Sequence, residues 1–467
     1  MEQVLKIITE VNGELNRFAW GPIMLLLLVG TGIYLTIRTG CIQVTKFGYI
    51  MKHTIGSLFQ KKDADHGQNL SPFQAVTTAM AATVGTGNIA GVTGAIFIGG
   101  PGAVFWMWFS AFFGMCTKYA EIALAVKFRS TNEKGEYRGG PMYYIAQGLG
   151  SNWKWLAAIF AVLGGITSFG IGNIAQSSEI AGAMEGLLGL DPIVTGLLLA
   201  VVVAIVVIGG VQRIGQVTSY MVPFMSIFYV LAGLAVIVLR LPSVPAAFGQ
   251  IFSQAFSLQA VGGGAVGSVM MLAIRQGVAR GVFSNEAGLG SAPIAHAASS
   301  HQDPARQAMW GVFEVFVDTI LICTITALTV LLSGMELGEA ALETYASKGA
   351  AAVAAFNAIL PGTIGGTLIE ISLLFFALST IISWSYYGER CWGYLTGENK
   401  VVSLVYKVMF VLVCIVGTTG SGTLMWDISD TLNGFMALPN LVALLLLSGT
   451  MAKITKDHFG KERLSAR

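Results

Sequence analysis

A cluster of small and polar residues interrupts a long apolar stretch of the sequence. Residues 79–91 read AMAATVGTGNIAG, within an apolar run that continues to Phe97 and is long enough to cross a membrane. The interruption consists of two glycines and three residues with polar side chains: Gly85, Gly87, Thr83, Thr86 and Asn88. Glycine weakens a helix, and irregular backbone occurs at membrane depth only where protein buries it or it lines a wet cavity. The pattern therefore predicts a broken membrane helix; the alternative is that the small residues only let helices pack closely.

A break of this kind creates two helix ends with different chemistry. The first half would end near Val84 and present backbone carbonyls that suit a cation. The second half would begin near Asn88 and present unpaired amides that suit an anionic group. No charged side chain is needed for either task, and residues 79–91 contain none. The stretch therefore predicts a binding site in mid-bilayer.

The composition is that of a membrane protein. The chain has 467 residues, of which 54% are hydrophobic and 11% charged, whereas soluble domains carry roughly a quarter charged residues. The five cysteines are scattered without metal or disulfide spacing. No metalloprotease or hydrolase motif and no repeated filter is present, so we expect neither an enzyme nor a channel. The net charge of +2 gives no indication of nucleic-acid binding.

Apolar segments predict an all-α polytopic protein with eleven transmembrane helices. The expected spans are 19–37, 71–97, 103–128, 154–185, 192–210, 215–240, 261–282, 305–333, 361–395, 401–418 and 426–452. Three of them begin with a capping residue followed by proline: Ser71-Pro72, Asp191-Pro192 and Asp303-Pro304. Residues 1–18 are predicted to form an interfacial amphipathic segment, and residues 453–467 a cytoplasmic tail that contacts membrane lipids.

The basic residues predict a plasma-membrane protein with its N-terminus outside and its C-terminus in the cytoplasm. In this orientation most lysines and arginines, Arg275 and Arg280 among them, are counted on the cytoplasmic side. The exceptions are Lys6, Arg17, Arg240 and Lys348.

The ten spans after the first divide into two sets of five, 71–240 and 261–452. Because five is odd, the two halves have opposite topologies, and each half of such a repeat opens with an interrupted helix. In the second half we expect the interruption within 261–282, where glycines are dense at 262–267 and the polar stretch 275–281 breaks the apolar character.

Several separate motifs carry a family resemblance. The stretch 84–88 is similar to the motif in the first core helix of LeuT-fold sodium symporters. From Trp20 onward the chain resembles the alanine/glycine:cation symporter family, with further matches at 99–102 (GGPG), 137–144 (YRGGPMYY) and 283–290 (FSNEAGLG). The resemblance implies a LeuT-like 5+5 inverted repeat preceded by one extra N-terminal helix. It also implies sodium-coupled import of a small neutral amino acid, alanine or glycine, with glutamine as the extension if the cavity is larger.

The resemblance assigns roles to named residues. The amides of Thr86 and Gly87, flanked by Gly85 and Asn88, would receive the substrate carboxylate. Sodium, the coupling ion, would be bound by backbone carbonyls and by hydroxyls of span 361–395: Ala81, Val84, Ser379, Thr380, with Ser383 as a substitute and Phe376 or Ala377 lending a carbonyl. The alternative is that these hydroxyls only bond the backbone of their own helix.

The remaining pocket walls are expected from three other spans. Gln176 would bond the substrate, and Phe283 and Trp384 would enclose a small side chain; helix packing is the competing interpretation for each. Thr83 and Asn88 match positions of a second sodium ion in some LeuT-fold relatives. The seventh span offers no clear counterpart of that site's other ligands, so we expect one sodium ion per substrate.

Acids within apolar segments are costly and usually functional. Six occur in or at the ends of the expected spans: Glu121, Glu179, Glu314, Asp318, Glu370 and Asp427. We predict an i, i+3 pair between Lys118 and Glu121, and a helix cap at Asp427. Any of the acids could pair with Arg275 or Arg280 as a gate. Proton-coupled amino acid transport, with Glu179 as the carboxylate, is the second functional hypothesis.

Overall fold

The computed structural model of the chain is almost wholly helical and describes residues 2–59, 67–257, 269–420 and 422–465. Among these residues the strand structure is one short antiparallel pair, β1 (Ser130–Thr131) with β2 (Tyr137–Arg138). The predicted all-α class is therefore confirmed.

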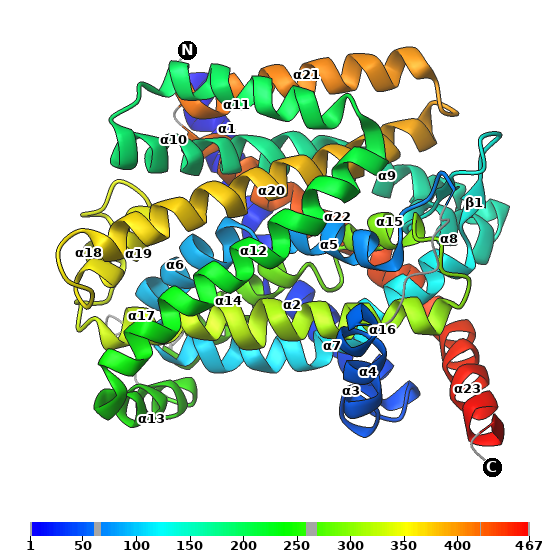
Figure 1. The fold of residues 1–467 in the computed structure, drawn as a ribbon, viewed down its shortest axis with the longest axis horizontal. Coiled ribbons are helices and arrows are strands. Elements are labelled where there is room, and N and C mark those ends of the chain that lie inside the picture. Colours follow the sequence, from blue (N-terminus) through cyan, green and yellow to red (C-terminus); the bar gives the residue numbers. More distant parts are fainter. Residues whose placement is uncertain (1, 60–66, 258–268, 421, 466–467) are drawn as a thin grey trace.

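Long, roughly aligned helices form the body of the molecule (Figure 1). In the N-terminal half they are α1 (Glu2–Ala19), α2 (Pro22–Arg38), α5 (Pro72–Thr83), α6 (Val92–Gly99), α7 (Gly102–Lys127), α9 (Lys154–Phe169), α10 (Ala175–Leu188), α11 (Pro192–Val207) and α12 (Gly210–Leu239). In the C-terminal half they are α14 (Val269–Asn285), α16 (Pro304–Val315), α17 (Thr324–Leu332), α20 (Ile364–Leu395), α21 (Lys400–Thr419) and α22 (Gly422–Leu446), with the six-residue helix α15 (Ala292–Ala297) between α14 and α16.

Three π-helical turns join pairs of these helices. They are η2 (Gly87–Gly91) before α6, η4 (Gly170–Ile174) between α9 and α10, and η6 (Phe316–Cys323) between α16 and α17. The peripheral helices and turns are α3 (Ile42–Thr45), α4 (Phe47–His53), η1 (Ile55–Phe59), α8 (Pro141–Gly148), η3 (Ser151–Trp153), η5 (Leu241–Ser243), α13 (Val244–Ala255), α18 (Glu339–Leu342), α19 (Lys348–Asn357) and α23 (Ser448–Ser465).

Within the described residues, eight helical stretches are long and apolar enough to cross a membrane. The α5–α6 pair, bent by 46°, provides a ninth span, and α11 is a shorter apolar helix. Residues 6–38 count as one span, so the structure joins most of the expected interfacial segment to the first expected helix. The last expected span (426–452) and the expected tail (453–467) also have different bounds in the structure: α22 begins at Gly422 and α23 begins at Ser448. The chain is a multi-pass membrane protein.

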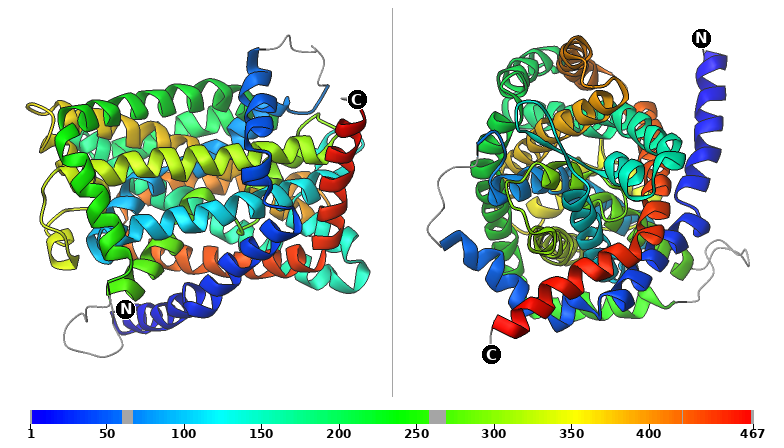
Figure 2. Two further views of the ribbon diagram at one scale, coloured as in Figure 1. Left: turned by 90° about the horizontal axis from the view of Figure 1, so that it is seen from below. Right: turned by 90° about the vertical axis from the view of Figure 1, so that its right-hand side faces the viewer.

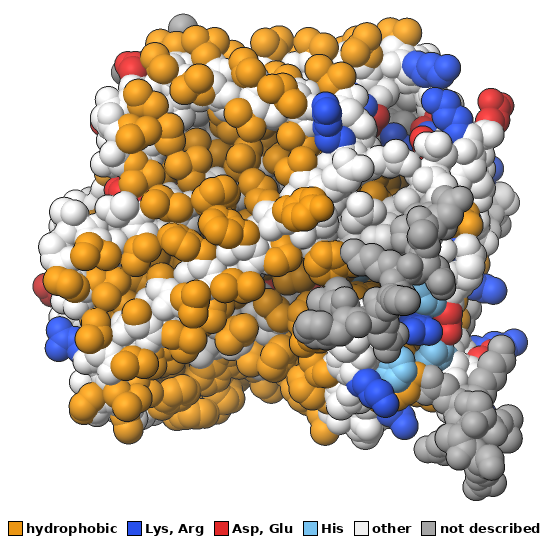
Figure 3. All heavy atoms as spheres, viewed as in Figure 1, with side chains coloured by type: hydrophobic (Ala, Val, Ile, Leu, Met, Phe, Trp, Pro, Cys, Tyr) orange, Lys and Arg blue, Asp and Glu red, His pale blue; other side chains and the backbone are white. Residues whose placement is uncertain are grey.

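The surface agrees with this assignment. Hydrophobic side chains cover the middle of the molecule, and charged side chains gather mainly at one end (Figure 3). On α11 the large side chains of Leu197, Val201 and Ile205 are all exposed. An apolar face of this kind suits contact with lipid chains, which are as apolar as the side chains themselves.

The predicted helix starts at Ser71, Asp191 and Asp303 are confirmed. Ser71 and Gln74 form a full capping box, with Pro72 in the first turn. The Asp191 side chain accepts a hydrogen bond from the amide of Ile193, and Asp303 caps α16 in the same manner. Asp427 is no cap, because α22 begins before it.

The expected interruption of the span 261–282 is tested only in part by the described residues, and the part that is described is continuous helix. Glycines 262–267 lie outside the described residues, and α14 runs unbroken through the polar stretch 275–281. The helix ends at Asn285, and a non-helical segment with positive φ at Glu286, Gly288 and Gly290 leads to α15. The polar stretch stays helical because its glycines serve packing: a Cβ at Gly277 or Gly281 would clash with α7.

The two ends of the bundle carry different elements. Helices α13, α18 and α19 lie at one end, and β1, α8 and α23 at the other (Figure 1). The chain termini lie toward opposite ends (Figure 2). Arg280 pairs with Asp430 at 3.2 Å, and Lys348 at the start of α19 is within electrostatic reach of both. The prediction that puts Arg280 at the opposite end from Lys348 is therefore wrong, because α14 continues past Arg280 before it breaks.

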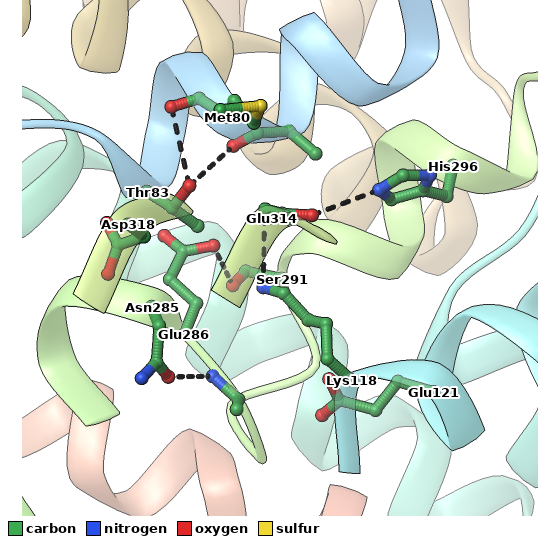
Figure 4. Close-up of polar contacts among 12 residues, drawn as sticks. Met80, Thr83, Lys118, Glu121, Asn285, Glu286, Ser291, His296, Glu314 and Asp318 are labelled. Atoms are coloured by element: carbon green, nitrogen blue, oxygen red, sulfur yellow. Dashed lines mark hydrogen bonds and ion pairs between the residues drawn. The ribbon is translucent and has the colours of Figure 1, made fainter. Parts of the chain in front are cut away.

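A buried charge cluster joins α7 to α16. Lys118 Nζ lies 3.3 Å from Glu314 Oε1, and His296 Nε2 lies 3.2 Å from Glu314 Oε2, all with fully buried side chains (Figure 4). Glu121 instead accepts hydrogen bonds from the amide of Gly288 and from Asn440. The predicted Lys118–Glu121 pair is therefore wrong: the two side chains have different partners on other helices.

We expect Lys118→Met to lower the free energy of unfolding by about 3–5 kcal/mol, because it leaves the Glu314 carboxylate buried without its cation. Thermal unfolding in detergent would measure the effect. Lys118→Met combined with Glu314→Gln should recover most of the loss, and Lys127→Met, at an exposed position, should have little effect. Equal destabilisation by the single and double variants would contradict the pairing.

Candidate functional site

The first helix break is confirmed at the predicted residues. Helix α5 ends at Thr83, Val84 leaves helical geometry with ψ 86°, and η2 begins at Gly87. The Gly85 amide donates to Asn88 Oδ1 at 2.8 Å, and the Asn88 amide donates to the Gly85 carbonyl at 3.1 Å. The Asn88 side chain thus bonds back to the amide three residues before it, whereas Thr86, at the cap position of η2, makes no side-chain cap bond.

Two backbone amides lie between Gly85 and Asn88, those of Thr86 and Gly87. Among the described residues, no acceptor is found for the N–H of Thr86 or of Gly87. Both residues are fully enclosed within the protein. A buried amide without a partner is rare and unfavourable, so these two donors indicate a place for an anionic ligand.

A small enclosed cavity adjoins the break. It is lined by six of the predicted substrate residues: Gly85, Thr86, Gly87, Gln176, Phe283 and Trp384. Thr380, predicted for sodium, also lines it. The space open to the centre of a water-sized sphere is about 10 Å³, which is room for about one water molecule. The cavity is therefore closed tightly in this conformation.

Other lining residues were not predicted for the substrate. They are Ala82, Thr83, Ile171, Glu286 and Asn433. Glu286 and Asn433 carry the polar groups of most interest. The sequence does contain a signal for Glu286, since it lies within the motif at 283–290, but only the break after Asn285 brings it to the cavity.

Gln176 ties the break to the neighbouring helix pair. Its Oε1 accepts a hydrogen bond from Thr86 Oγ1 at 3.0 Å, and its Nε2 donates to the Ile171 carbonyl at 3.1 Å. The Ile171 carbonyl is available because it belongs to the π-helical turn η4, where the regular helical pattern is interrupted. The amide group of Gln176 is thus positioned at the cavity wall by both of its ends.

Phe283 and Trp384 form two bulky walls. A Cβ added at Gly87 would lie 3.1 Å from the Phe283 ring, so only glycine leaves room there. A Cβ at Gly172 would meet Trp384 at 2.5 Å. Small residues on one helix therefore face large ones on the next, and little space remains for a ligand side chain.

Asn88, predicted for the substrate, is not among the residues that line the cavity, and its side chain bonds other groups of the protein. Its Nδ2 donates to Asp318 Oδ1 at 2.6 Å. The same carboxylate accepts hydrogen bonds from Ser284 at 3.0 Å and Thr319 at 2.7 Å. Asp318 thus touches both interrupted helices, and it forms no ion pair within the part of the chain that the structure describes. The seventh expected span offers no clear counterpart of the other ligands of a second sodium site, whereas Asp318 lies on the eighth.

The predicted sodium residues of α20 meet the end of α5. Ser379 Oγ and Thr380 Oγ1 lie 3.1 and 3.2 Å from the Ala81 carbonyl. The same hydroxyls lie 2.8 and 3.0 Å from the Phe376 carbonyl. Four oxygens from two helices therefore come together, while each hydroxyl also bonds its own helix. This geometry is compatible both with ion binding and with hydroxyls that only bond the backbone.

Two of the predicted sodium residues make no contact with this group of four oxygens among the described residues. Val84 is buried at the bend, and Ser383 lies one turn beyond Ser379 on α20. The Ser383 hydroxyl is buried and finds no partner among the described residues. Glu179, the predicted proton carrier, does not line the cavity and lies 3.5 Å from Ser347 at the end of the bundle.

An ion pair between Arg280 and Asp430 lies next to the ring of Phe283. The Arg280 guanidinium lies 5.4 Å from the centre of the Phe283 ring and pairs with Asp430 of α22. The N-terminal helix holds the same aspartate: Asn16 donates to Asp430 Oδ2 at 3.1 Å, and Trp20 Nε1 donates to its backbone carbonyl at 3.1 Å. Helix α1 and the following Trp20 therefore hold α22 near Asn433, the residue of α22 that lines the cavity.

The fold of the chain is similar to that of LeuT-fold transporters of known structure, at low sequence identity. MhsT, solved in complex with L-phenylalanine, has a TM-score of 0.57 at 15% identity, covering 83% of this chain and 98% of that one. A manganese transporter from Eremococcus coleocola gives 0.54 at 13% identity, with 85% and 89% covered. Because one of these proteins binds an amino acid and the other transports a metal ion, the fold alone does not decide the substrate.

The chain belongs to the sodium:alanine symporter family, which it matches over residues 5–466. It is 47% identical over 444 residues to the sodium/alanine symporter AgcS of Methanococcus maripaludis, covering 94% of this chain and 95% of the relative. The protein is therefore a secondary transporter and not an enzyme.

The glycines of the first break provide a matched test of the packing. Gly87→Ala should lower the free energy of unfolding by about 1–3 kcal/mol, because the new methyl group presses on Phe283. Gly91→Ala, in the same turn with nothing within 4 Å of its added Cβ, should be neutral or slightly stabilising. Thermal unfolding of both variants checks this, and a larger loss at Gly91 would contradict the described geometry.

Proposed function

We propose that the protein is a sodium-coupled symporter that imports a small neutral amino acid, alanine or glycine, by alternating access. The observation that carries the proposal is the pair of unbonded amides at Thr86 and Gly87 beside a closed cavity. These donors, at the start of a half-helix, suit a carboxylate. No basic side chain lines the cavity among the described residues, so the amides are the groups available for that task.

The small size of the cavity supports a small substrate. Phe283 and Trp384 reduce the cavity, and Gly87 and Gly172 allow them to approach closely. Sodium/alanine transport by the relative AgcS agrees with this interpretation. Glutamine, the larger alternative, would require Phe283 or Trp384 to move.

The coupling ion is proposed to be sodium, bound by oxygens of Ala81, Phe376, Ser379 and Thr380, with Val84 and Ser383 completing the set. Carbonyls and hydroxyls are hard, neutral ligands that suit a monovalent hard cation. Such an ion would link α5 to α20 and thereby hold the break in the geometry that exposes its amides. The two ligands would then favour each other's binding.

A second candidate is proton coupling through Asp318. Its carboxylate is fully buried, contacts both interrupted helices and forms no ion pair with a described residue. A buried carboxylate of this kind tends to bind a proton or a cation. Asp318 replaces Glu179 as the carboxylate for this candidate, because Asp318 contacts both interrupted helices, whereas Glu179 bonds Ser347 at the end of the bundle.

The arrangement in the membrane is proposed as eleven spans, with five-helix repeats at 71–240 and 261–452 after one extra helix. The nine spans, the short apolar helix α11 and helix α14 would together make up that number. The N-terminus is placed outside and the C-terminus in the cytoplasm, where the basic α23 would meet membrane lipids. Arg280 and Asp430 would then close the outer side.

Uptake into proteoliposomes tests the function. We expect labelled alanine and glycine to accumulate when a sodium gradient is imposed, and accumulation to stop when choline replaces sodium. Accumulation that follows a pH gradient and ignores sodium would favour the proton mechanism. Absence of uptake of alanine, glycine and glutamine under both gradients would reject the proposal.

Ser379→Ala tests the sodium site without altering the cavity lining. We expect the sodium concentration for half-maximal uptake to rise about tenfold, equivalent to about 1.4 kcal/mol, because one oxygen is lost. Ser372→Ala is the matched control, since this buried hydroxyl of α20 bonds only the Leu368 carbonyl among the described residues. The same shift in both variants, or in neither, would reject the site.

A further inference from the structure

One acidic side chain lines the cavity among the described residues, and it is Glu286. The residue is the first after α14 and is 3% exposed. Its φ of 56° lies in the left-handed region, which residues other than glycine rarely adopt. The backbone is thus held in an unfavourable conformation at the point where the second interrupted helix meets the cavity, and such conformations gather at functional sites.

The contacts of Glu286 match an ionised carboxylate. Trp384 Nε1 donates to Oε1 at 3.1 Å, and Ser291 Oγ donates to Oε2 at 2.6 Å. Figure 4 shows the Glu286–Ser291 contact next to Thr83 of the first break. A carboxylate can accept about four hydrogen bonds. Each oxygen therefore retains a free acceptor position, and no ion pair to Glu286 occurs in the described part of the chain.

Packing does not require this negative charge. A glutamine of the same size could accept from Trp384 and donate to Ser291, and it would avoid the cost of burying a charge. The charge of the nearby Lys118 acts on Glu286 from a distance, but Lys118 forms its ion pair with Glu314 and not with Glu286. A charge that the protein could have omitted indicates a partner that enters the cavity with the opposite sign.

We propose that Glu286 binds the α-ammonium group of the substrate. This inference rests on the proposed function and deepens it. The amides of Thr86 and Gly87 on one interrupted helix receive the carboxylate, and Glu286 on the other receives the ammonium. The two breaks together therefore recognise a zwitterion, and Gln176, whose amide already bonds Thr86 and Ile171, positions the first break.

The test removes the charge from each partner in turn. Alanine and L-lactate share the carboxylate and methyl group, but lactate carries a hydroxyl group in place of the ammonium. In the wild-type protein we expect lactate to compete with labelled alanine about 100-fold or more less well than unlabelled alanine does, since an unfilled polar site rejects its ligand's analogue strongly. Glu286→Gln should weaken alanine binding and narrow that ratio about tenfold or more.

Two variants separate direct contact from a structural role. Glu286→Asp keeps the charge, so it should keep most of the preference for alanine over lactate even if both bind more weakly. Glu121→Gln alters a buried carboxylate that does not line the cavity, so the ratio should stay at the wild-type value. A Glu286→Gln protein that loses affinity for both ligands equally would overturn the proposal, because it would show that Glu286 only supports Trp384 and Ser291.

Competition by lactate in the wild-type protein is by itself a test of the ammonium site. Lactate that competes within about threefold of alanine would overturn the ammonium site even if Glu286→Gln did not fold. Failure of the proposed function is distinguishable, since a wild-type protein that binds no alanine at all would reject the amino-acid carrier itself. Alanine binding with an unchanged ratio in Glu286→Gln would reject only the role of Glu286.

Discussion

The structure depends on how the backbone polar groups are satisfied where a membrane helix stops. In lipid, an unpaired N–H or C=O is expensive, so a break survives only if the surroundings supply partners. Here the partners are specific: Asn88 bonds the Gly85 amide, and hydroxyls of Ser379 and Thr380 reach the Ala81 carbonyl. The amides of Thr86 and Gly87 are left beside the cavity. The same requirement that makes the break costly thus leaves a binding surface with a defined polarity.

Buried charge is arranged in two different ways. The Lys118–Glu314–His296 cluster is paired and joins α7 to α16 away from the cavity lining. Glu286 and Asp318 are instead satisfied by neutral donors, and both lie at the interrupted helices. Paired charges stabilise a fixed arrangement, whereas charges that lack a counter-ion respond to a ligand that brings one. This difference separates the scaffold from the parts that would take part in coupling. The Arg280–Asp430 pair combines features of both arrangements. Its charges are paired and Asn16 of α1 bonds Asp430, yet Arg280 contacts Phe283, which lines the cavity.

Local patterns in the sequence were sufficient for several features. The break at residues 84–87 was predictable because closely spaced glycines weaken a helix and because residues 84–88 also resemble the motif in the first core helix of LeuT-fold symporters. The caps at Ser71, Asp191 and Asp303 were predictable because they depend on neighbours within a few residues. The polar stretch 275–281 was wrongly expected to interrupt its helix, because glycines 277 and 281 have the same local appearance as helix breakers but serve contact with α7. The pairing of Lys118 was misassigned for a similar reason, since an i, i+3 neighbour is visible in the sequence and Glu314 is not.

By itself, the sequence determined a helical, multi-pass membrane protein with an interrupted helix at a known position, and it indicated the sodium:alanine symporter family. These properties follow from hydrophobicity, local propensity and contiguous motifs, which are encoded along the chain. Only the tertiary structure decided that Asn88 turns to Asp318, that Glu286 and Asn433 reach the cavity, and that α1 fastens Asp430. Each of these contacts joins residues far apart in the sequence, and its geometry depends on the packing of several helices at once, which no local pattern specifies.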